Sequence, residues 1–261
     1  MTGLRGAIFD VDGVLVDSPH EQAWRESLRE LMESEWLDLR DRTTWSPDAF
    51  TAEVYQRHVS GRPRLDGARA ALEHFGVPDL DRHTTRYAER KQAMVTRLID
   101  AGDFRAYPDA LRFIIAAKDA GLRVAAASSS KNAARYLARI DLAAFAAGEG
   151  IASASLRPGT TLLGFFDADV SGRDFAHGKP HPEMFLTAAA ELGVEPAASV
   201  VLEDAAAGVE AAKAGGMTAV GIARADDADL LAKAGADLVV TSLDAVDPRP
   251  LADGRLTLRV P

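Results

Sequence analysis

Short apolar runs alternate with alanine-rich stretches of helical periodicity after residue 104 of the chain. Runs of this kind are typical of buried strands, and their alternation with helices predicts a parallel sheet covered on both sides. We therefore expect an α/β fold with a doubly wound, Rossmann-like parallel sheet as its core. The expected strands are 6–10, 121–130, 198–204, 216–222 and 236–240. The expected helices are 107–120, 131–140, 182–192, 204–215 and 226–234.

The segment after the first strand has a different pattern. It contains amphipathic helical periodicity and no alternating strand pattern, which predicts an all-α block. An all-α block inserted after the first strand of a sheet is best interpreted as a separate cap domain. We expect an α-helical cap domain at 18–103 and a Rossmann-like core domain at 1–17 and 104–261. The helices expected in the cap are roughly 19–33, 47–58, 66–75 and 80–100.

One stretch of the core does not fit the alternation. Residues 149–166 contain Pro158 and Gly159 and have no clear period, so we expect a loop insertion there.

Composition narrows the class of protein. The 261 residues are 47% hydrophobic and 26% charged, as expected for a globular protein, and the net charge is −9. An acidic balance argues against nucleic acid or a membrane surface as partner, because both require a basic face. No apolar run approaches the length of a membrane span, and the early first strand leaves no room for a signal peptide. We expect a cytoplasmic monomer.

The absence of cysteine excludes some chemistry. With no cysteine in the chain, neither a disulfide framework nor a thiolate nucleophile is possible.

Acidic and small polar residues follow the predicted strands. In an open parallel sheet, ligands bind at the carboxyl ends of the strands. The first strand ends in "DVDG", a second in "SSSKN", and a third in the acidic pair of "VLED". A lysine in "HGKPHPEMF" precedes a predicted helix. The residues expected to converge at this edge are Asp10, Asp12, Ser128, Lys179, Glu203 and Asp204.

These residue types suit phosphoryl transfer. Oxygen ligands from carboxylates favour Mg²⁺, which would also offset the repulsion between Asp10 and Asp12. A carboxylate can act as nucleophile and form an aspartyl-phosphate, while a second one acts as general acid and base. A serine and a lysine can hold the phosphoryl oxygens.

Each motif also has a structural interpretation. Asp10-x-Asp12-Gly13 occurs in calcium loops, but an EF-hand requires further acids where this chain has apolar residues. The pair Glu203-Asp204 and the stretch "SSSKN" are both able to cap helices. It is their joint occurrence at strand ends that favours a catalytic site.

The motifs "DVDGVLVDS", "SSSKN", "GKPHPEMF" and "LEDAAAGVEAAKAGG" resemble, in the expected order, the four motifs of the haloacid dehalogenase-like phosphotransferase superfamily. The resemblance extends from residue 5 to about 240, and the helical insert is similar to the small α-helical cap of that superfamily. Within it, the chain is most similar to the β-phosphoglucomutase group.

The resemblance assigns roles to particular residues. It implies that Asp10 is the nucleophile, Asp12 the general acid and base, and Ser128 and Lys179 the phosphate-holding groups. It implies a Mg²⁺ site made by Asp10, Asp12 through its carbonyl, Glu203 and Asp204. Substrate contacts are implied for six residues, three of them in the cap: His20, Gly61, Arg64, Ser130, Lys131 and Asn132.

The resemblance leaves alternatives open. We expect a Mg²⁺-dependent enzyme acting on a small sugar phosphate, most similar to a phosphomutase that converts β-glucose 1-phosphate to glucose 6-phosphate. A sugar-phosphate phosphatase uses the same core residues, and a non-catalytic module that senses a phosphorylated ligand is a third reading. For Arg64 a solvated charge, and for His20 a local structural role, are the competing interpretations.

Overall fold

The computed structural model describes residues 3–224, 227–253 and 255–258. The chain forms two units, one made of Met1–Asp17 with Arg105–Pro261 and the other of Ser18–Phe104. We propose that these units are the core domain and the cap domain expected from the sequence.

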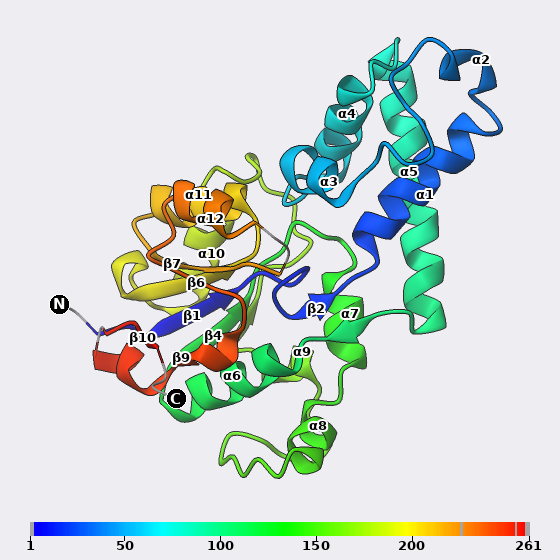
Figure 1. Ribbon diagram of the computed structural model, residues 1–261. Coiled ribbons are helices and arrows are strands. Elements are labelled where there is room, and N and C mark those ends of the chain that lie inside the picture. The colour runs from blue at the N-terminus through cyan, green and yellow to red at the C-terminus, as the bar shows by residue number, and fades with distance from the viewer. Residues whose placement is uncertain (1–2, 225–226, 254, 259–261) are drawn as a thin grey trace. The chain divides into compact units, whose positions relative to one another are not determined.

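A six-stranded parallel sheet forms the centre of the first unit, with the strand order β5-β4-β1-β6-β7-β8 (Figure 1). Strand β1 lies between β4 and β6, with Ile8 opposite both Ala125 and Val201. The chain adds strands first on one side of β1 and then on the other, so the strand order reverses at β1, and in open α/β sheets ligands bind at the carboxyl end of the strands at such a point. The strands are β1 (Gly6–Phe9), β4 (Arg123–Ala126), β5 (Ala168–Asp169), β6 (Ser199–Glu203), β7 (Thr218–Ile222) and β8 (Leu238–Val240).

This sheet confirms the predicted α/β fold and the five expected strands. Strand β5 was not expected, because two residues at the edge of a sheet leave no apolar run to detect.

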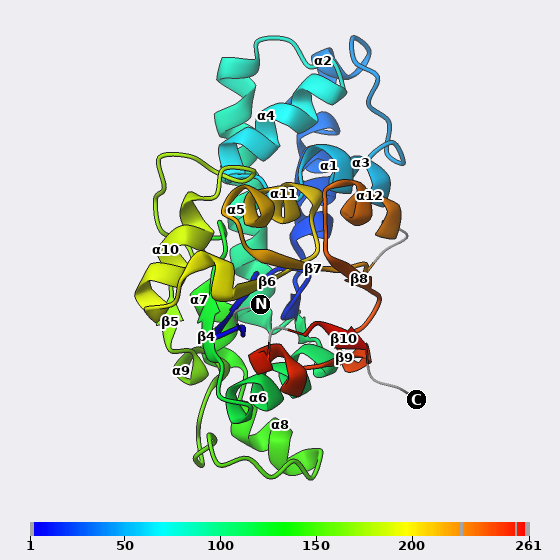
Figure 2. The ribbon, with the colours of Figure 1, turned by 90° about the vertical axis from the view of Figure 1, so that its left-hand side faces the viewer.

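Helices cover both faces of the sheet. Three helices lie on one face, α10 (Glu183–Leu192), α11 (Ala206–Ala214) and α12 (Ala228–Lys233), and α6 (Pro108–Asp119) lies on the other (Figures 1 and 2). The expected start of the last helix at residue 226 lies outside the described residues.

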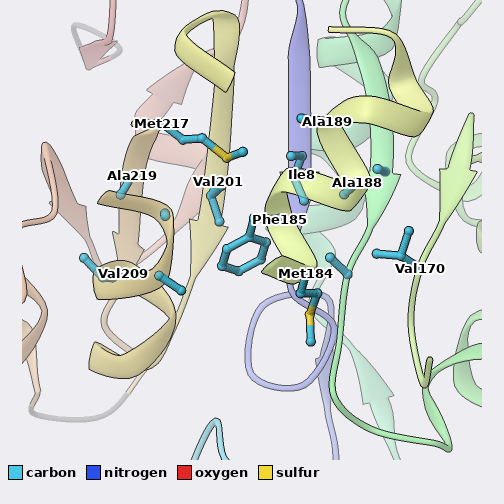
Figure 3. Packing of buried hydrophobic residues seen from close by; sticks show 14 of the residues in the cluster. Ile8, Val170, Met184, Phe185, Ala188, Ala189, Val201, Val209, Met217 and Ala219 are labelled. Carbon is cyan, nitrogen blue, oxygen red and sulfur yellow. The ribbon is translucent and has the colours of Figure 1, made fainter. Parts of the chain in front are cut away.

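A cluster of buried apolar side chains lies between the sheet and α10–α11. Phe185 of α10 is fully buried in one cluster with Ile8 of β1 and Val201 of β6, and small alanines let the helices approach the strands closely (Figure 3). Burial of these apolar side chains stabilises the packing of the helices on the sheet, and this packing holds the strand ends that carry the candidate site in place.

Smaller elements complete the first unit. The expected loop insertion at 149–166 is wrong at its end, where Thr161 accepts a hydrogen bond of 3.2 Å from the Gly164 backbone and caps a short helix. Strands β2 and β3 pair with each other, as do β9 and β10. These elements are β2 (Val16–Asp17), β3 (Arg105–Ala106), α7 (Ala133–Arg139), α8 (Leu142–Gly148), α9 (Leu162–Phe165), β9 (Val246–Asp247) and β10 (Thr257–Leu258), with 3₁₀ turns η1 (Pro196–Ala198), η2 (Leu243–Ala245) and η3 (Arg249–Asp253).

The second unit is helical, as predicted, and residues 18–104, all of them described, contain no strand. Its aromatic core contains Trp24, Trp36, Trp45 and Tyr87, and the Tyr87 hydroxyl donates a 2.8 Å hydrogen bond to the Trp24 carbonyl. Its helices are α1 (His20–Met32), α2 (Leu37–Arg40), α3 (Ala52–His58), α4 (Arg64–His74) and α5 (Leu80–Ala101). None of the helices among the described residues of either unit has the length and apolar character needed to cross a membrane.

Candidate active site

A buried lysine lies between two carboxylates at the carboxyl ends of β1 and β6. The Lys179 ammonium is 2.6 Å from Asp10 Oδ1 and also contacts Glu203 Oε1. The side chains of Lys179 and Glu203 are 1% and 0% exposed, so these charges interact in a low-dielectric environment. Removing charges from water costs free energy unless they are paired, and here one ammonium is shared by two carboxylates.

A tight turn after β1 carries Asp12. The Val11 carbonyl accepts hydrogen bonds of 2.9 Å from both Leu15 and Val16, and the Gly13 N–H donates to the Val16 carbonyl. Gly13 has a φ of +83°, which favours glycine, and a Cβ atom there would overlap the Asp204 carboxylate. The turn therefore brings Asp204 directly over the backbone between β1 and β2.

Strand β6 delivers Glu203 and Asp204 to the same edge. Glu203 is fully buried, and its second oxygen accepts a 2.9 Å hydrogen bond from the Ala205 N–H. A Cβ atom on Gly208 would overlap the Glu203 carboxylate, so α11 begins close against it. Glycines at both positions make room for the two acids.

The loop after β4 adds hydroxyl groups. Ser128 Oγ lies 3.4 Å from Asp12 Oδ2 and accepts a 3.1 Å hydrogen bond from the Ser130 N–H. Ser130 Oγ in turn accepts from the Asn132 N–H at 3.3 Å. These serines thus hold the loop and the start of α7 in place, whereas Lys131 extends to the surface, 2.6 Å from Asp174.

The site has an excess of negative charge. Burial raises the pKa of Asp10 to about 8, with Lys179 opposing the rise and Glu203 adding to it. Burial and the neighbouring Glu203 also raise the pKa of Asp204. Burial alone would lower the pKa of Lys179, but Asp10 and Glu203 raise it above its usual value, so the lysine keeps its proton.

Oxygen donors with such an excess of charge fit a divalent cation. With its four acids ionised and Lys179 protonated, the cluster carries three uncompensated negative charges, and its donors are hard oxygens with no thiolate or imidazole among the expected ligands. A bound divalent cation would stabilise the ionised forms of Asp10 and Asp204.

A second group of potential ligands has a structural explanation. His177, His181 and Glu183 lie together at the start of α10. The Glu183 carboxylate accepts hydrogen bonds from the backbone N–H groups of Ala176 and His177, at 3.3 and 2.9 Å. Glu183 therefore fastens the loop that carries Lys179.

The remaining expected residues belong to the helical unit. His20 is the first residue of α1 and is 8% exposed. Gly61 has a φ of +73°. Arg64 lies outside the helix expected at 66–75 but is the first residue of α4, which begins directly after Pro63. Arg64 is exposed and donates a 2.9 Å hydrogen bond to Gln92.

The sequence did not predict the burial or the contacts of two charged residues, Lys91 and Arg224. Lys91 of α5 is 5% exposed, with its ammonium 4.7 Å from the ring centre of Trp24. Arg224 follows β7 and contacts the turn after β1. Neither a lysine within a helix nor an arginine after a strand gives a sequence signal of burial.

Comparison with known proteins places this site in context. Residues 4–216 match the family described as haloacid dehalogenase-like hydrolase. The chain is 33% identical to the β-phosphoglucomutase of Mycobacterium bovis, over 92% of this chain and 90% of that protein. It is 28% identical to a phosphorylated carbohydrates phosphatase of Thermotoga maritima, over 91% and 94%. The crystal structure of an archaeal β-phosphoglucomutase from Pyrococcus sp. strain ST 04 superposes with a TM-score of 0.65 at 27% identity, covering 92% of this chain and 93% of that one.

The fold and the comparisons together define an α/β enzyme that is a phosphomutase or a phosphatase. The chain belongs to the haloacid dehalogenase-like hydrolase family. Membership of this family implies a divalent metal.

Proposed function

We propose that the protein is a Mg²⁺-dependent phosphomutase that converts β-glucose 1-phosphate to glucose 6-phosphate through an aspartyl-phosphate on Asp10. The observation that carries this proposal is the buried contact between Asp10 and Lys179 at the sheet reversal point, with Asp12 in the adjoining turn. The similarity to the Mycobacterium bovis β-phosphoglucomutase supports a mutase.

The proposed reaction has two steps. In the first, an Asp10 carboxylate oxygen attacks a phosphorus of β-glucose 1,6-bisphosphate, the bond from that phosphorus to the sugar oxygen breaks, and Asp12 gives its proton to the oxygen, which releases glucose 6-phosphate. In the second, a hydroxyl of β-glucose 1-phosphate attacks the aspartyl-phosphate, loses its proton to Asp12 and regenerates both the Asp10 carboxylate and the bisphosphate. Lys179 and Ser128 stabilise the negative charge of the transferred group throughout.

Metal binding is part of the proposal. Asp10, Glu203, Asp204 and the Asp12 carbonyl would hold Mg²⁺, which supplies positive charge against the phosphoryl oxygens. Contacts to the sugar phosphate are proposed for His20, Gly61, Arg64, Ser130, Lys131 and Asn132.

A sugar phosphatase is the second candidate. The similarity to the Thermotoga maritima phosphatase supports it, because such an enzyme performs the same first step and then uses water in place of the second hydroxyl. A mutase must exclude that water while the aspartyl-phosphate exists.

One experiment separates the two functions. The protein is incubated with β-glucose 1-phosphate, Mg²⁺ and a trace of β-glucose 1,6-bisphosphate, and ³¹P NMR follows the products. A mutase yields glucose 6-phosphate with little inorganic phosphate. Stoichiometric release of inorganic phosphate would contradict the mutase and support the phosphatase, and turnover of neither kind would contradict both.

We expect metal removal to abolish turnover. Treatment with EDTA should remove activity and excess Mg²⁺ should restore it, because the acidic cluster requires a cation to receive a phosphate dianion. Asp204→Ala should raise the Mg²⁺ concentration needed for half-maximal activity by at least ~10-fold, the factor that ~1.4 kcal/mol of lost binding produces. Full activity in EDTA would contradict the proposed metal site.

We expect Arg64→Ala to lower mutase turnover by at least ~10-fold, since loss of a charge-assisted contact to the distal phosphate exceeds ~1.4 kcal/mol. Hydrolysis of acetyl phosphate, which has no distal phosphate, should change little. Arg62→Ala, an exposed neighbour, controls for loss of charge, and Gln92→Ala removes the partner of Arg64 while keeping its cation. Equal loss with both substrates would indicate a structural role for Arg64.

A further inference from the structure

Arg224 contacts the turn that carries Asp12. Its guanidinium donates hydrogen bonds of 3.3 Å to the carbonyl oxygens of both Gly13 and Val14. It also stacks over the ring of Tyr107, 3.9 Å from the ring centre, and the Tyr107 N–H donates to the Leu15 carbonyl. Three consecutive carbonyl groups of the turn are therefore held by this pair of residues.

Asp109 fixes the guanidinium from the other side. Two Arg224 nitrogens donate to its two carboxylate oxygens at 2.9 and 3.1 Å, and the side chains of Arg224 and Asp109 are 17% and 8% exposed. Asp109 also accepts from the Leu243 N–H at 2.8 Å and from Ser242 Oγ at 3.0 Å. Burial by itself would raise the pKa of Asp109, but the hydrogen bonds from Arg224, Leu243 and Ser242 lower it, so Asp109 stays ionised opposite the arginine.

These contacts connect the turn after β1 to three other parts of the core unit. Arg224 follows β7, Asp109 lies in the first turn of α6, and Leu243 begins the 3₁₀ turn after β8. A planar guanidinium with donors in a fixed fork suits a site that has a carboxylate on one side and carbonyl groups on the other. A lysine ammonium cannot reach both sides in this geometry.

We propose that Arg224 is a positioning residue for the proposed phosphoryl transfer: it fixes the backbone of the turn and thereby aims Asp12 at the oxygen of the leaving group. This inference rests on the proposed function. Loss of Arg224 should affect the protonation step more than the attack by Asp10. Asp10 is fixed separately, by Lys179 and by the 3.0 Å hydrogen bond from its own N–H to the Leu202 carbonyl.

The choice of leaving group distinguishes a defect in protonation by Asp12 from a defect in the attack by Asp10. A sugar alkoxide is a poor leaving group and needs the proton of a correctly placed acid, whereas p-nitrophenolate leaves without one. A displacement of the acid by about 1 Å can cost ~10²-fold. Misplacing Asp12 should therefore lower kcat/KM for the sugar phosphate much more than for p-nitrophenyl phosphate, while general damage lowers both equally.

The decisive variant is Arg224→Lys, which keeps a cation beside Asp109 and is therefore expected to fold. The ratio of kcat/KM for the sugar phosphate to that for p-nitrophenyl phosphate should fall at least ~10-fold, approaching the drop of the reference variant Asp12→Asn. The double variant Arg224→Met/Asp109→Asn, which leaves no buried unpaired charge, should lower the ratio at least as far. An unchanged ratio in both variants would overturn the proposal.

Arg112→Met is the matched control. Arg112 also forms a forked pair with an aspartate, Asp244, at 2.9 and 2.7 Å. This pair joins α6 to η2, the same two elements that hold Asp109, but neither of its members belongs to the turn after β1. We expect this variant to keep the wild-type ratio. If the ratio falls equally in Arg112→Met, loss of any such pair explains it, and the special role of Arg224 is overturned.

A second measurement is independent of activity. Hydrogen exchange of the Gly13 and Leu15 amides should be at least ~10-fold faster in Arg224→Lys, corresponding to ~1.4 kcal/mol of local stability, and unchanged in Arg112→Met. An unchanged exchange rate of these amides in Arg224→Lys would overturn the positioning role, whatever the catalytic activity of the variant. Failure of the proposed function would be recognised by a different result: beryllium fluoride with Mg²⁺ would then not bind to Asp10 in the wild-type protein.

Discussion

Replacing Asp10 with asparagine is expected to lower turnover of every phosphate ester by at least ~10³-fold, because loss of a covalent nucleophile removes the reaction path itself. The amide is nearly the same size and keeps an oxygen that is able to accept the 2.6 Å hydrogen bond from Lys179, so the fold should persist. Product formation measured by ³¹P NMR, together with circular dichroism, checks both expectations.

A trapping experiment identifies the atom that reacts. Beryllium fluoride with Mg²⁺ should give a protein-bound ¹⁹F resonance in the wild type that is absent from Asp10→Asn. Asp17→Asn, an exposed acid of β2, is the control and should retain activity. Retention of more than a few per cent of activity by Asp10→Asn, confirmed with Asp10→Ala to exclude deamidation, would contradict the covalent mechanism.

Lys179→Met is expected to lower turnover by ~10²–10³-fold, since the ammonium stabilises charge that develops during transfer. It should also lower the free energy of unfolding by ~3–5 kcal/mol in EDTA, because Glu203 remains buried without its cation. Urea denaturation at neutral pH measures this loss.

The stability control uses another lysine of the same unit. Lys213 pairs with Asp237 at 2.7 Å, but the two side chains are 36% and 40% exposed. Lys213→Met should therefore cost ~1 kcal/mol or less. If Lys179→Met were as stable as the wild type, the buried carboxylates would have to be neutral without the lysine, and the charge balance described for the site would be wrong.

The central strands were predictable because burial on both faces makes them continuous apolar runs. Strand β6 reads "SVVLE" and is buried at every position. The same signal is missing from β5, which has two half-buried residues, and from α9, a four-residue helix with a threonine cap. Elements this short are stabilised by their neighbours, and the local sequence carries little of that information.

The core of the candidate site was predictable for a topological reason. Asp10, Ser128 and Glu203 each follow or end a strand, and parallel strands bring their carboxyl ends to one edge. Arg224 could not be predicted, because its partners lie 115 and 211 residues away along the chain, at Asp109 and Gly13. No local pattern marks a side chain whose position depends on four separate segments.

The antiparallel pairing of β2 with β3 has a consequence for how this protein could diversify. Val16 lies opposite Ala106 and Asp17 opposite Arg105, so the chain leaves and rejoins the core at adjacent points, ~5 Å apart. Any polypeptide whose two ends meet at that spacing could be spliced in place of Ser18–Phe104 without breaking a hydrogen bond of the six-stranded sheet. Recombination at the β2–β3 pair can therefore exchange the whole inserted segment, while the residues at the ends of the sheet strands are retained.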